Sequence, residues 1–229
     1  MWEQLSRKLL DTIFPPRCSG CQKIGDWLCQ DCWQSLALAK TPLCYRCGRI
    51  SPGFRICPGC RKAGGLSRLI FCGYWQDPLR RLILNLKYRR LRILADYLIE
   101  LMVNSWGLVA EPIDLVVPVP LHWRRSWQRG FNQAEILATG VAKKLGVNTA
   151  DLLVRQKSTQ PQFSLAKTNR QSNVLGVFAV KKRWQGSVSG KIVLVVDDVV
   201  ATGSTIEECA KILRQKGAKQ VWGLVIARA

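Results

Sequence analysis

The fold is decided by one stretch near the C-terminal end, Ile192-Val193-Leu194-Val195-Val196-Asp197-Asp198-Val199-Val200-Ala201-Thr202-Gly203-Ser204-Thr205. It begins with five apolar residues in succession, which is typical of a parallel strand buried on both faces of its sheet. We expect a strand over residues 191–196, ending at Val196, and a helix over residues 205–216. A buried strand that leads directly into a helix is the repeating unit of an α/β fold.

The chain repeats this alternation from Gly64-Gly65 onward. Its hydrophobic pattern predicts further strands over 69–75, 114–119, 152–154, 177–180 and 221–227. It predicts helices over 78–88, 91–106 and 133–145, the first with Asp77 as its N-cap. We therefore expect a doubly wound parallel sheet with helices on both faces. The 229 residues suffice for one such domain, at 67–229, and a small cysteine-rich module at 1–66.

Ligands of doubly wound sheets bind outside the carboxyl ends of the strands, where Asp197 and Asp198 follow the apolar run. Adjacent carboxylates suit the paired hydroxyl donors of a ribose, and both side chains are expected to point at solvent or ligand. The small and hydroxylated residues after them would close backbone N–H groups around a phosphate at the start of a helix; they are Ala201, Thr202, Gly203, Ser204 and Thr205. The alternative is local capping, because Ser204 and Glu207 match a capping box.

Eight of the ten cysteines form four C-x-x-C pairs: Cys18/Cys21, Cys29/Cys32, Cys44/Cys47 and Cys57/Cys60. Two such pairs complete the tetrahedral thiolate shell that zinc prefers, so we expect two structural zinc ions. Redox pairs or disulfides are the alternative. Sequential and cross-braced pairing of the four pairs both stay open. The remaining cysteines, Cys72 and Cys209, lie in apolar surroundings and read as core residues.

The charge is strongly positive, with 35 Lys and Arg against 15 Asp and Glu and a net charge of +20. A surplus of this size favours polyanionic partners. Basic residues alternate with aromatic ones at 87–90, 123–131 and 181–184, a pattern that suits single-stranded nucleic acid. The alternative is that these aromatic side chains cover the edges of the core while Lys and Arg keep the chain soluble.

No stretch reaches the roughly 20 apolar residues of a membrane span, and the N-terminus lacks the features of a signal peptide, so we expect a cytoplasmic protein. Near that end, one helical face carries Trp2, Leu5, Leu9 and Ile13. This face would pack on the protein's own body or on a partner or membrane surface.

The residues from Val195 to Thr205 resemble the phosphoribosyl pyrophosphate signature of type I phosphoribosyltransferases. The full chain, with its cysteine pairs, resembles the ComF family of competence-associated, phosphoribosyltransferase-like proteins. Further matches are Val117-Pro118-Val119-Pro120, Arg129-Gly130-Phe131-Asn132-Gln133, Arg155, Thr159, Gln160, Gln162, Leu165, Arg170, Asn173 and Gly176-Val177-Phe178.

The resemblance implies that Asp197 and Asp198 hold the ribose of phosphoribosyl pyrophosphate and that residues 201–205 hold its 5′-phosphate. The turn over 120–125 would lie beside the pyrophosphate, with Mg²⁺, and residues 155–170 would form a lid. Arg124, Arg125 and Arg129 supply cations there, unless they are merely solvated. Arg155 and Arg170 belong to the implied lid, and His122 is the only histidine.

Two functions follow from the resemblance. The first is a role in DNA uptake and natural transformation, with single-stranded DNA as a ligand and a DNA-uptake helicase and other competence proteins as partners. The second is transfer of the phosphoribosyl group to a base or amine, without a DNA role. In an enzyme, Asp197, Asp198, Arg124 and Arg125 would be the catalytic residues. The residues do not disclose an acceptor, so the enzyme question stays open at this point.

Overall fold

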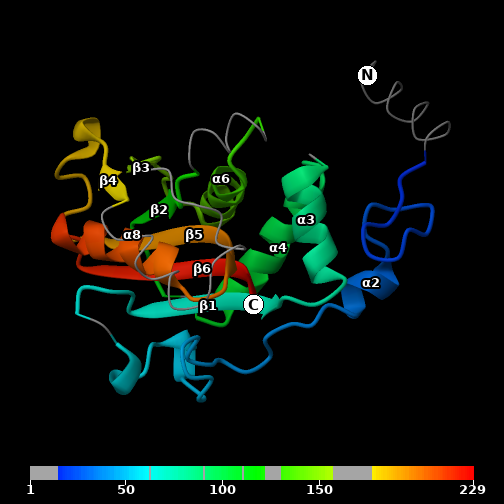
Figure 1. Cartoon of the computed structure of the whole chain (residues 1–229), viewed down its shortest axis with the longest axis horizontal. Helices are drawn as coiled ribbons and strands as arrows, with labels where there is room; N and C mark the ends of the chain where they lie inside the picture. The colour runs from blue at the N-terminus through cyan, green and yellow to red at the C-terminus, as the bar shows by residue number, and fades with distance from the viewer. Residues whose placement is uncertain (1–14, 62, 90, 110, 122–129, 157–176) are drawn as a thin grey trace.

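A four-stranded parallel sheet forms the centre of the molecule (Figure 1). The computed structural model describes residues 15–61, 63–89, 91–109, 111–121, 130–156 and 177–229. The strand order is β1-β6-β5-β2, with β1 at Arg68–Tyr74, β6 at Gln220–Arg228, β5 at Ile192–Val200 and β2 at Leu115–Pro118. Val193, Leu194, Val195 and Val196 of β5 are fully buried, as the apolar run predicts for a strand covered on both faces.

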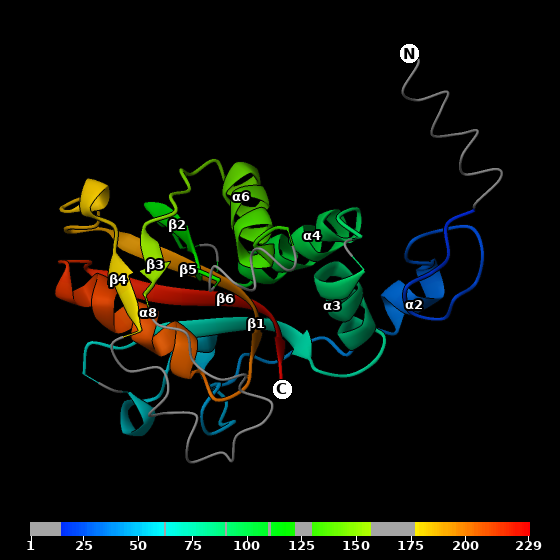
Figure 2. The same cartoon turned by 45° about the horizontal axis from the view of Figure 1, so that its top comes forward.

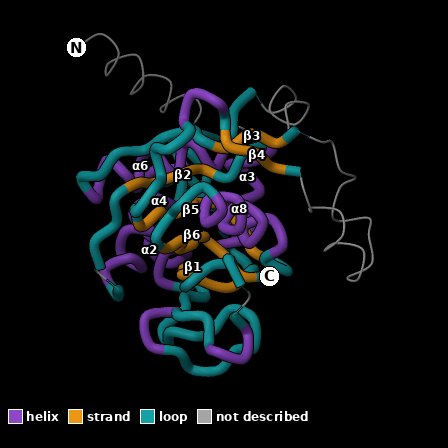
Figure 3. The backbone as a smooth tube through the Cα atoms, turned by 90° about the vertical axis from the view of Figure 1, so that its left-hand side faces the viewer, coloured by secondary structure: helices purple, strands orange, loops and turns teal. Residues whose placement is uncertain are grey.

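Helices cover both faces of this sheet. α4 (Leu94–Gly107) packs on β1 and β6, and α6 (Gln133–Leu145) packs on β2 and β5. α8 (Ser204–Gln215) lies on the opposite face against β5 and β6, and α3 (Leu79–Tyr88) packs on α4. Figure 3 shows the strands edge-on between α4 and α6 on one side and α8 on the other. The predicted α/β class with a parallel sheet is confirmed.

The strand order reverses between β2 and β5. After α6 the chain returns beside β2, where Thr149 forms a parallel bridge with Val116. β5 pairs with the other edge of β2, with Pro118 opposite Val196. Connections that leave in opposite directions open a crevice at the carboxyl ends of the two strands. This crevice is where a ligand site is expected.

β5 continues beyond the predicted end at Val196. It stays paired with β6 as far as Val200, which lies opposite Arg228, whereas β2 ends at Pro118. Asp197 and Asp198 therefore lie inside β5. In this part of the strand, within the described residues, β5 pairs with β6 alone, because β2 has already ended. The apolar run marks where burial on both faces ends, not where pairing ends.

Two smaller elements also differ from expectation. β3 (Leu153–Arg155) and β4 (Phe178–Val180) form a separate antiparallel pair instead of extending the parallel sheet. Asp77 does not cap α3, because its carboxylate accepts from the guanidinium groups of Arg80 and Arg81 at 2.9 and 2.8 Å. Short helical turns complete the described elements: α2 (Gln30–Gln34), η1 (Pro52–Phe54), η2 (Pro58–Cys60) and η4 (Lys182–Trp184).

The two cysteine-rich units lie at different places on the α/β domain (Figures 1 and 2). The first meets the start of α3, where Arg81 donates to the carbonyl oxygen of Gly20 at 2.7 Å. The second lies beside β1, with Arg55 bridged to Arg68, and beside the start of α8. The apolar face at residues 2–13 lies outside the described residues. Among the described helices, none has the length and apolar character to cross a membrane.

Candidate functional site

A cleft of about 200 Å³ lies at the carboxyl ends of β2 and β5. It therefore occupies the point where the strand order reverses, as the topology requires. Its walls come from α3, the end of β2, the start of α6, β3 and the turn after β5. The residues that carry polar or charged groups into its lining are Lys87, Tyr88, Asn132, Gln133, Arg155, Asp197, Asp198 and Thr205.

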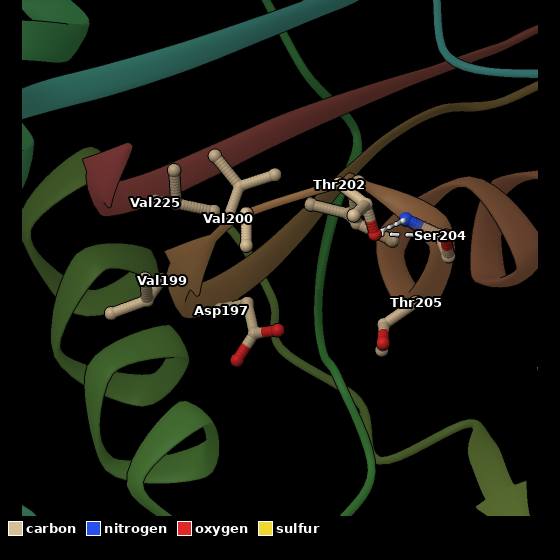
Figure 4. A pocket seen from close by; sticks show the side chains of 10 residues that line it. Asp197, Val199, Val200, Thr202, Ser204, Thr205 and Val225 are labelled. Atoms are coloured by element: carbon tan, nitrogen blue, oxygen red, sulfur yellow. Dashed lines mark hydrogen bonds between the residues drawn. The ribbon is translucent and has the colours of Figure 1, made fainter. Parts of the chain in front are cut away.

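Asp197 lines both this cleft and the hollow of the turn after β5. Figure 4 shows it on the same side of the β5–α8 turn as the hydroxyl group of Thr205. Burial, and after it the negative charge of Asp198, raise the pKa of Asp197 to about 7, although the N–H of Asp198, which donates to it at 2.8 Å, lowers the pKa. An acidic group with a pKa this far from its usual range, in a cleft, is typical of a functional site.

Asp198 departs from the expectation that both carboxylates point at solvent or ligand. It is 9% exposed, and its Oδ1 accepts from Nζ of Lys87 at 2.8 Å. Lys87 comes from the last turn of α3, whose buried face carries Leu79, Leu82, Ile83 and Leu86. The sequence marks Lys87 only as part of a basic and aromatic run. A contact across 111 residues leaves no local signal from which this pairing could be predicted.

The turn from Ala201 to Thr205 leads into α8 with the geometry of an anion-binding corner. Gly203 is the N-cap and has a φ of 77°, in the left-handed region that favours glycine. Oγ1 of Thr202 lies 2.9 Å from Oγ of Ser204 and accepts from the Ser204 N–H at 3.4 Å. A hollow of about 30 Å³ lies within this turn. The N-terminus of α8 adds the partial positive charge of its N–H groups.

The capping-box alternative for this turn is wrong. The N-cap position is Gly203, which has no side chain to accept from the helix. Glu207 accepts instead from the Tyr45 hydroxyl, the Arg46 guanidinium and the N–H of Leu66. The carboxylate of Glu207 is therefore engaged by the second cysteine unit and by Leu66 instead of capping α8.

Of the arginines predicted to lie beside the pyrophosphate or in the lid, Arg155 is the one among the described residues. It lines the cleft, and its guanidinium lies 5.6 Å from the ring centre of Phe178. The other predicted cations, with the histidine and most of the expected lid, lie outside the described residues: Arg124, Arg125, Arg129, Arg170, His122 and residues 157–170.

The eight paired cysteines form two separate clusters. One contains Cys18, Cys21, Cys29 and Cys32, the other Cys44, Cys47, Cys57 and Cys60. Within each cluster the four sulfur atoms lie within 4.8 Å of one another, so the pairs group sequentially and are not cross-braced.

The thiol chemistry of both clusters fits zinc. Burial would raise the pKa of Cys18, yet N–H groups of Cys21, Cys29 and Gly20 lower it to about 6. Cys44 shows the same balance, with N–H groups of Cys47, Cys57 and Arg46 and a pKa of about 6. Each cluster thus holds a sulfur that favours the thiolate form, which is the form that binds a metal. Four cysteine sulfur atoms that lie within 4.8 Å of one another are consistent with one structural zinc ion in each cluster.

Comparison with known families gives two matches on this chain. A double zinc ribbon domain matches residues 9–63, and a phosphoribosyl transferase domain matches residues 132–228. The fold, the β5–α8 corner and the cysteine clusters thus define the class: a protein that joins zinc ribbons to a phosphoribosyltransferase domain.

Relatives of known name cover most of the chain. Competence protein F of Haemophilus influenzae is 29% identical in an alignment of 223 residues that covers 87% of this chain and 96% of that protein. DNA utilization protein YhgH of Escherichia coli K12 is 33% identical in an alignment of 214 residues that covers 88% of this chain and 91% of that one. Competence protein ComFC of Bacillus subtilis is 24% identical in an alignment of 205 residues that covers 85% of this chain and 81% of that protein. The chain belongs to the ComF family.

Proposed function

We propose that the chain binds phosphoribosyl pyrophosphate in the cleft between β2 and β5. The observation that carries the proposal is the meeting of a carboxylate, Asp197, and a phosphate-sized corner at Ala201–Thr205 on the same side of one strand-to-helix turn (Figure 4). The carboxylate suits ribose hydroxyl donors, and the N–H groups at the start of α8 suit the 5′-phosphate. The phosphoribosyl transferase domain match supports the same ligand class.

The carboxylate oxygen atoms in the cleft also fit Mg²⁺, a hard cation that prefers oxygen ligands. Asp197 would help to hold it, and the ion would neutralise charge on the pyrophosphate. The part of the cleft proposed for the pyrophosphate begins at Pro120 and Leu121, the last described residues of the turn after β2. Arg124, Arg125, Arg129, Arg155 and Arg170 are the proposed cations for this end of the ligand.

Calorimetric titration with phosphoribosyl pyrophosphate and with ribose 5-phosphate tests this proposal. We expect the wild-type chain to bind both, with Mg²⁺ needed for full affinity only by the pyrophosphate compound. Asp197→Asn should weaken both ligands at least tenfold, because each hydrogen bond to a charged group contributes about 1.5–3 kcal/mol. Lys211→Met, on the exposed face of α8, is the matched control. Equal binding by Asp197→Asn and the control would contradict the proposed site.

We further propose that the chain binds single-stranded DNA and acts in DNA uptake and natural transformation. Tyr88 is 61% exposed at the edge of the cleft, next to Lys87 and Arg89. In η4, Arg183 lies 5.8 Å from the ring centre of Trp184 and is exposed. Aromatic faces beside cations suit stacked bases and their phosphates. Relatives named for competence and DNA utilization support this role.

DNA binding is tested by fluorescence anisotropy of a labelled oligonucleotide at several salt concentrations. We expect the affinity to fall steeply with salt, because each neutralised phosphate releases counterions. Tyr88→Ala should cost about 1–3 kcal/mol, the contribution of one stacked base, whereas Lys211→Ala should change little. Affinity that does not depend on salt, or that is unchanged by Tyr88→Ala, would count against this function.

Transfer of the phosphoribosyl group is a second candidate function. A neighbouring hollow of about 690 Å³ shares Pro120, Leu121, Asn132 and Arg155 with the cleft. This gives room for an acceptor beside the sugar. The test is release of pyrophosphate from phosphoribosyl pyrophosphate with a panel of bases and amines. Release with one acceptor would establish an enzyme, and binding without release across the panel would favour a sensor of the ligand.

A further inference from the structure

The second cysteine cluster lies against the turn that is proposed to bind phosphate. Tyr45 and Arg46 are the two residues between Cys44 and Cys47, in a tight turn closed by N–H groups of Gly48 and Cys44, which donate to the carbonyl oxygens of Cys44 and Arg49 at 2.8 Å each. Both flanking cysteines belong to one four-sulfur cluster. The positions of the two side chains therefore depend on whether this cluster holds a metal ion. The turn Cys44–Cys47 is called the second knuckle below.

Tyr45 packs on the back of the phosphate turn. It is 4% exposed, and a Cβ atom placed on Gly203 would come within 2.6 Å of its ring. The ring therefore occupies the space that any side chain at position 203 would need. Gly203 is also the N-cap of α8 with a φ of 77°. The second knuckle thus supports Gly203, and the conformation of Gly203 sets the direction of the first N–H groups of α8.

Glu207 ties the same knuckle to the first turn of α8. Its Oε1 accepts from the Tyr45 hydroxyl at 2.5 Å and from the Arg46 guanidinium at 2.7 Å, and its Oε2 accepts from the N–H of Leu66 at 3.1 Å. A free carboxylate in this turn would repel a phosphate at the helix N-terminus. Pairing with Arg46 neutralises that charge and leaves the favourable end of the helix dipole for a ligand.

We propose that the second knuckle is a positioning element for the phosphosugar site, with Tyr45 as its main positioning residue. The role rests on the proposed binding of a phosphorylated ribose. Metal bound to the second cluster keeps Tyr45 and Arg46 in place, and these hold Gly203 and Glu207. Loss of metal from this cluster weakens phosphosugar binding. The first cluster has a smaller effect, because its described contacts are with α3 and α4, through Gly20 with Arg81 and Trp33 with Tyr97.

The experiment uses the full-length, zinc-loaded chain and ribose 5-phosphate, a probe that engages only the sugar and the 5′-phosphate. Tyr45→Ala should weaken binding about tenfold, mainly because loss of the buried ring leaves a cavity behind Gly203 and the start of α8. Tyr45→Phe keeps the ring against Gly203 and should stay within about threefold of wild type. Hydrogen exchange should speed up in Tyr45→Ala at the amides of residues 203–206 more than elsewhere, a local change that general destabilisation does not produce.

The metal dependence is tested with two matched variants, because Cys47 and Cys21 are the exposed second cysteines of their clusters. Each change should remove one zinc ion, but Cys47→Ser should weaken ribose 5-phosphate binding at least threefold more than Cys21→Ser does. Equal losses in the two variants, or unchanged binding in Tyr45→Ala, would overturn the positioning role alone. A wild-type chain that binds no ribose 5-phosphate would overturn the proposed function and this role together.

Discussion

At the scale of single residues, Asp197 shows how the cleft changes the chemistry of a carboxyl group. It lies inside β5, beyond the end of β2, where it is half-buried and lines the cleft. Burial and the neighbouring Asp198 raise its pKa to about 7. Near neutral pH the group therefore changes charge, although an ordinary aspartate would be ionised.

This pKa predicts how ligand binding depends on pH. Ribose hydroxyls donate to the ionised carboxylate, and the ionised fraction of a group with a pKa of about 7 grows roughly tenfold from pH 6 to pH 8. We expect the affinity for ribose 5-phosphate to rise by a similar factor over this range. Calorimetry at both pH values measures it, and Asp197→Asn should leave only the smaller change that comes from the second ionisation of the ligand's own phosphate, with a pKa of about 6. An affinity that falls, or a step as large in Asp197→Asn as in wild type, would contradict this role.

The raised pKa of Asp197 has the opposite effect on the stability of the fold, which should decrease as the pH rises. The folded chain holds the Asp197 proton up to about pH 7, whereas the unfolded chain loses it near pH 4. The folded state is therefore favoured by this group at low pH, and that stability is lost as the pH rises from about 4 through about 7. Urea titration measures the free energy of unfolding of Asp197→Asn and of wild type. The difference between the two should accordingly favour the variant more at pH 8 than at pH 4.

Lys87 and Asp198 should be coupled in stability. Their side chains are only 16% and 12% exposed, so removal of one partner leaves the other charge poorly solvated. Lys87→Met should lower the free energy of unfolding by about 1–3 kcal/mol. Asp198→Asn in the same chain should restore part of this loss. A double-mutant cycle by urea titration measures the coupling, and strictly additive effects would show that the ion pair contributes nothing.

At the scale of elements, the sequence predicts best where hydrophobic periodicity and burial coincide. The helix over 133–145 has the predicted bounds, and Asn132 caps it by accepting from the N–H of Ala134 at 3.2 Å. The end of β5 was predicted less well. Its last residues are no longer a continuous apolar run, because they pair with β6 alone, beyond the end of β2. The antiparallel pairing of β3 with β4 was also missed, since short apolar runs carry no information about direction.

The cysteine spacing likewise predicted two clusters but not their contacts. Cys44→Ser should reduce the zinc content from two ions to one and lower thermal stability, because metal binding is part of the folding free energy of such a unit. Cys72→Ser is the control, since Cys72 lies outside both clusters and donates to the Val225 carbonyl oxygen at 3.3 Å. Metal analysis by mass spectrometry measures both. Unchanged stoichiometry in Cys44→Ser would contradict the assignment of the second cluster.

At the scale of the whole molecule, the two cysteine clusters connect to different helices of the same cleft. The first contacts α3, which carries Lys87 at its far end, and the second contacts the start of α8. These contacts join residues 61 and 161 positions apart, so no sequence window could have predicted them. The boundary between residues 66 and 67 stays a prediction about how the chain divides into domains.

The most direct test of the central claim is a crystal structure of the chain with phosphoribosyl pyrophosphate and Mg²⁺. We expect the 5′-phosphate within hydrogen-bond distance of the N–H groups of residues 203–205, and the ribose hydroxyls against Asp197. Ligand density at another place on the molecule, or a β5–α8 corner without density at saturating ligand, would contradict the account.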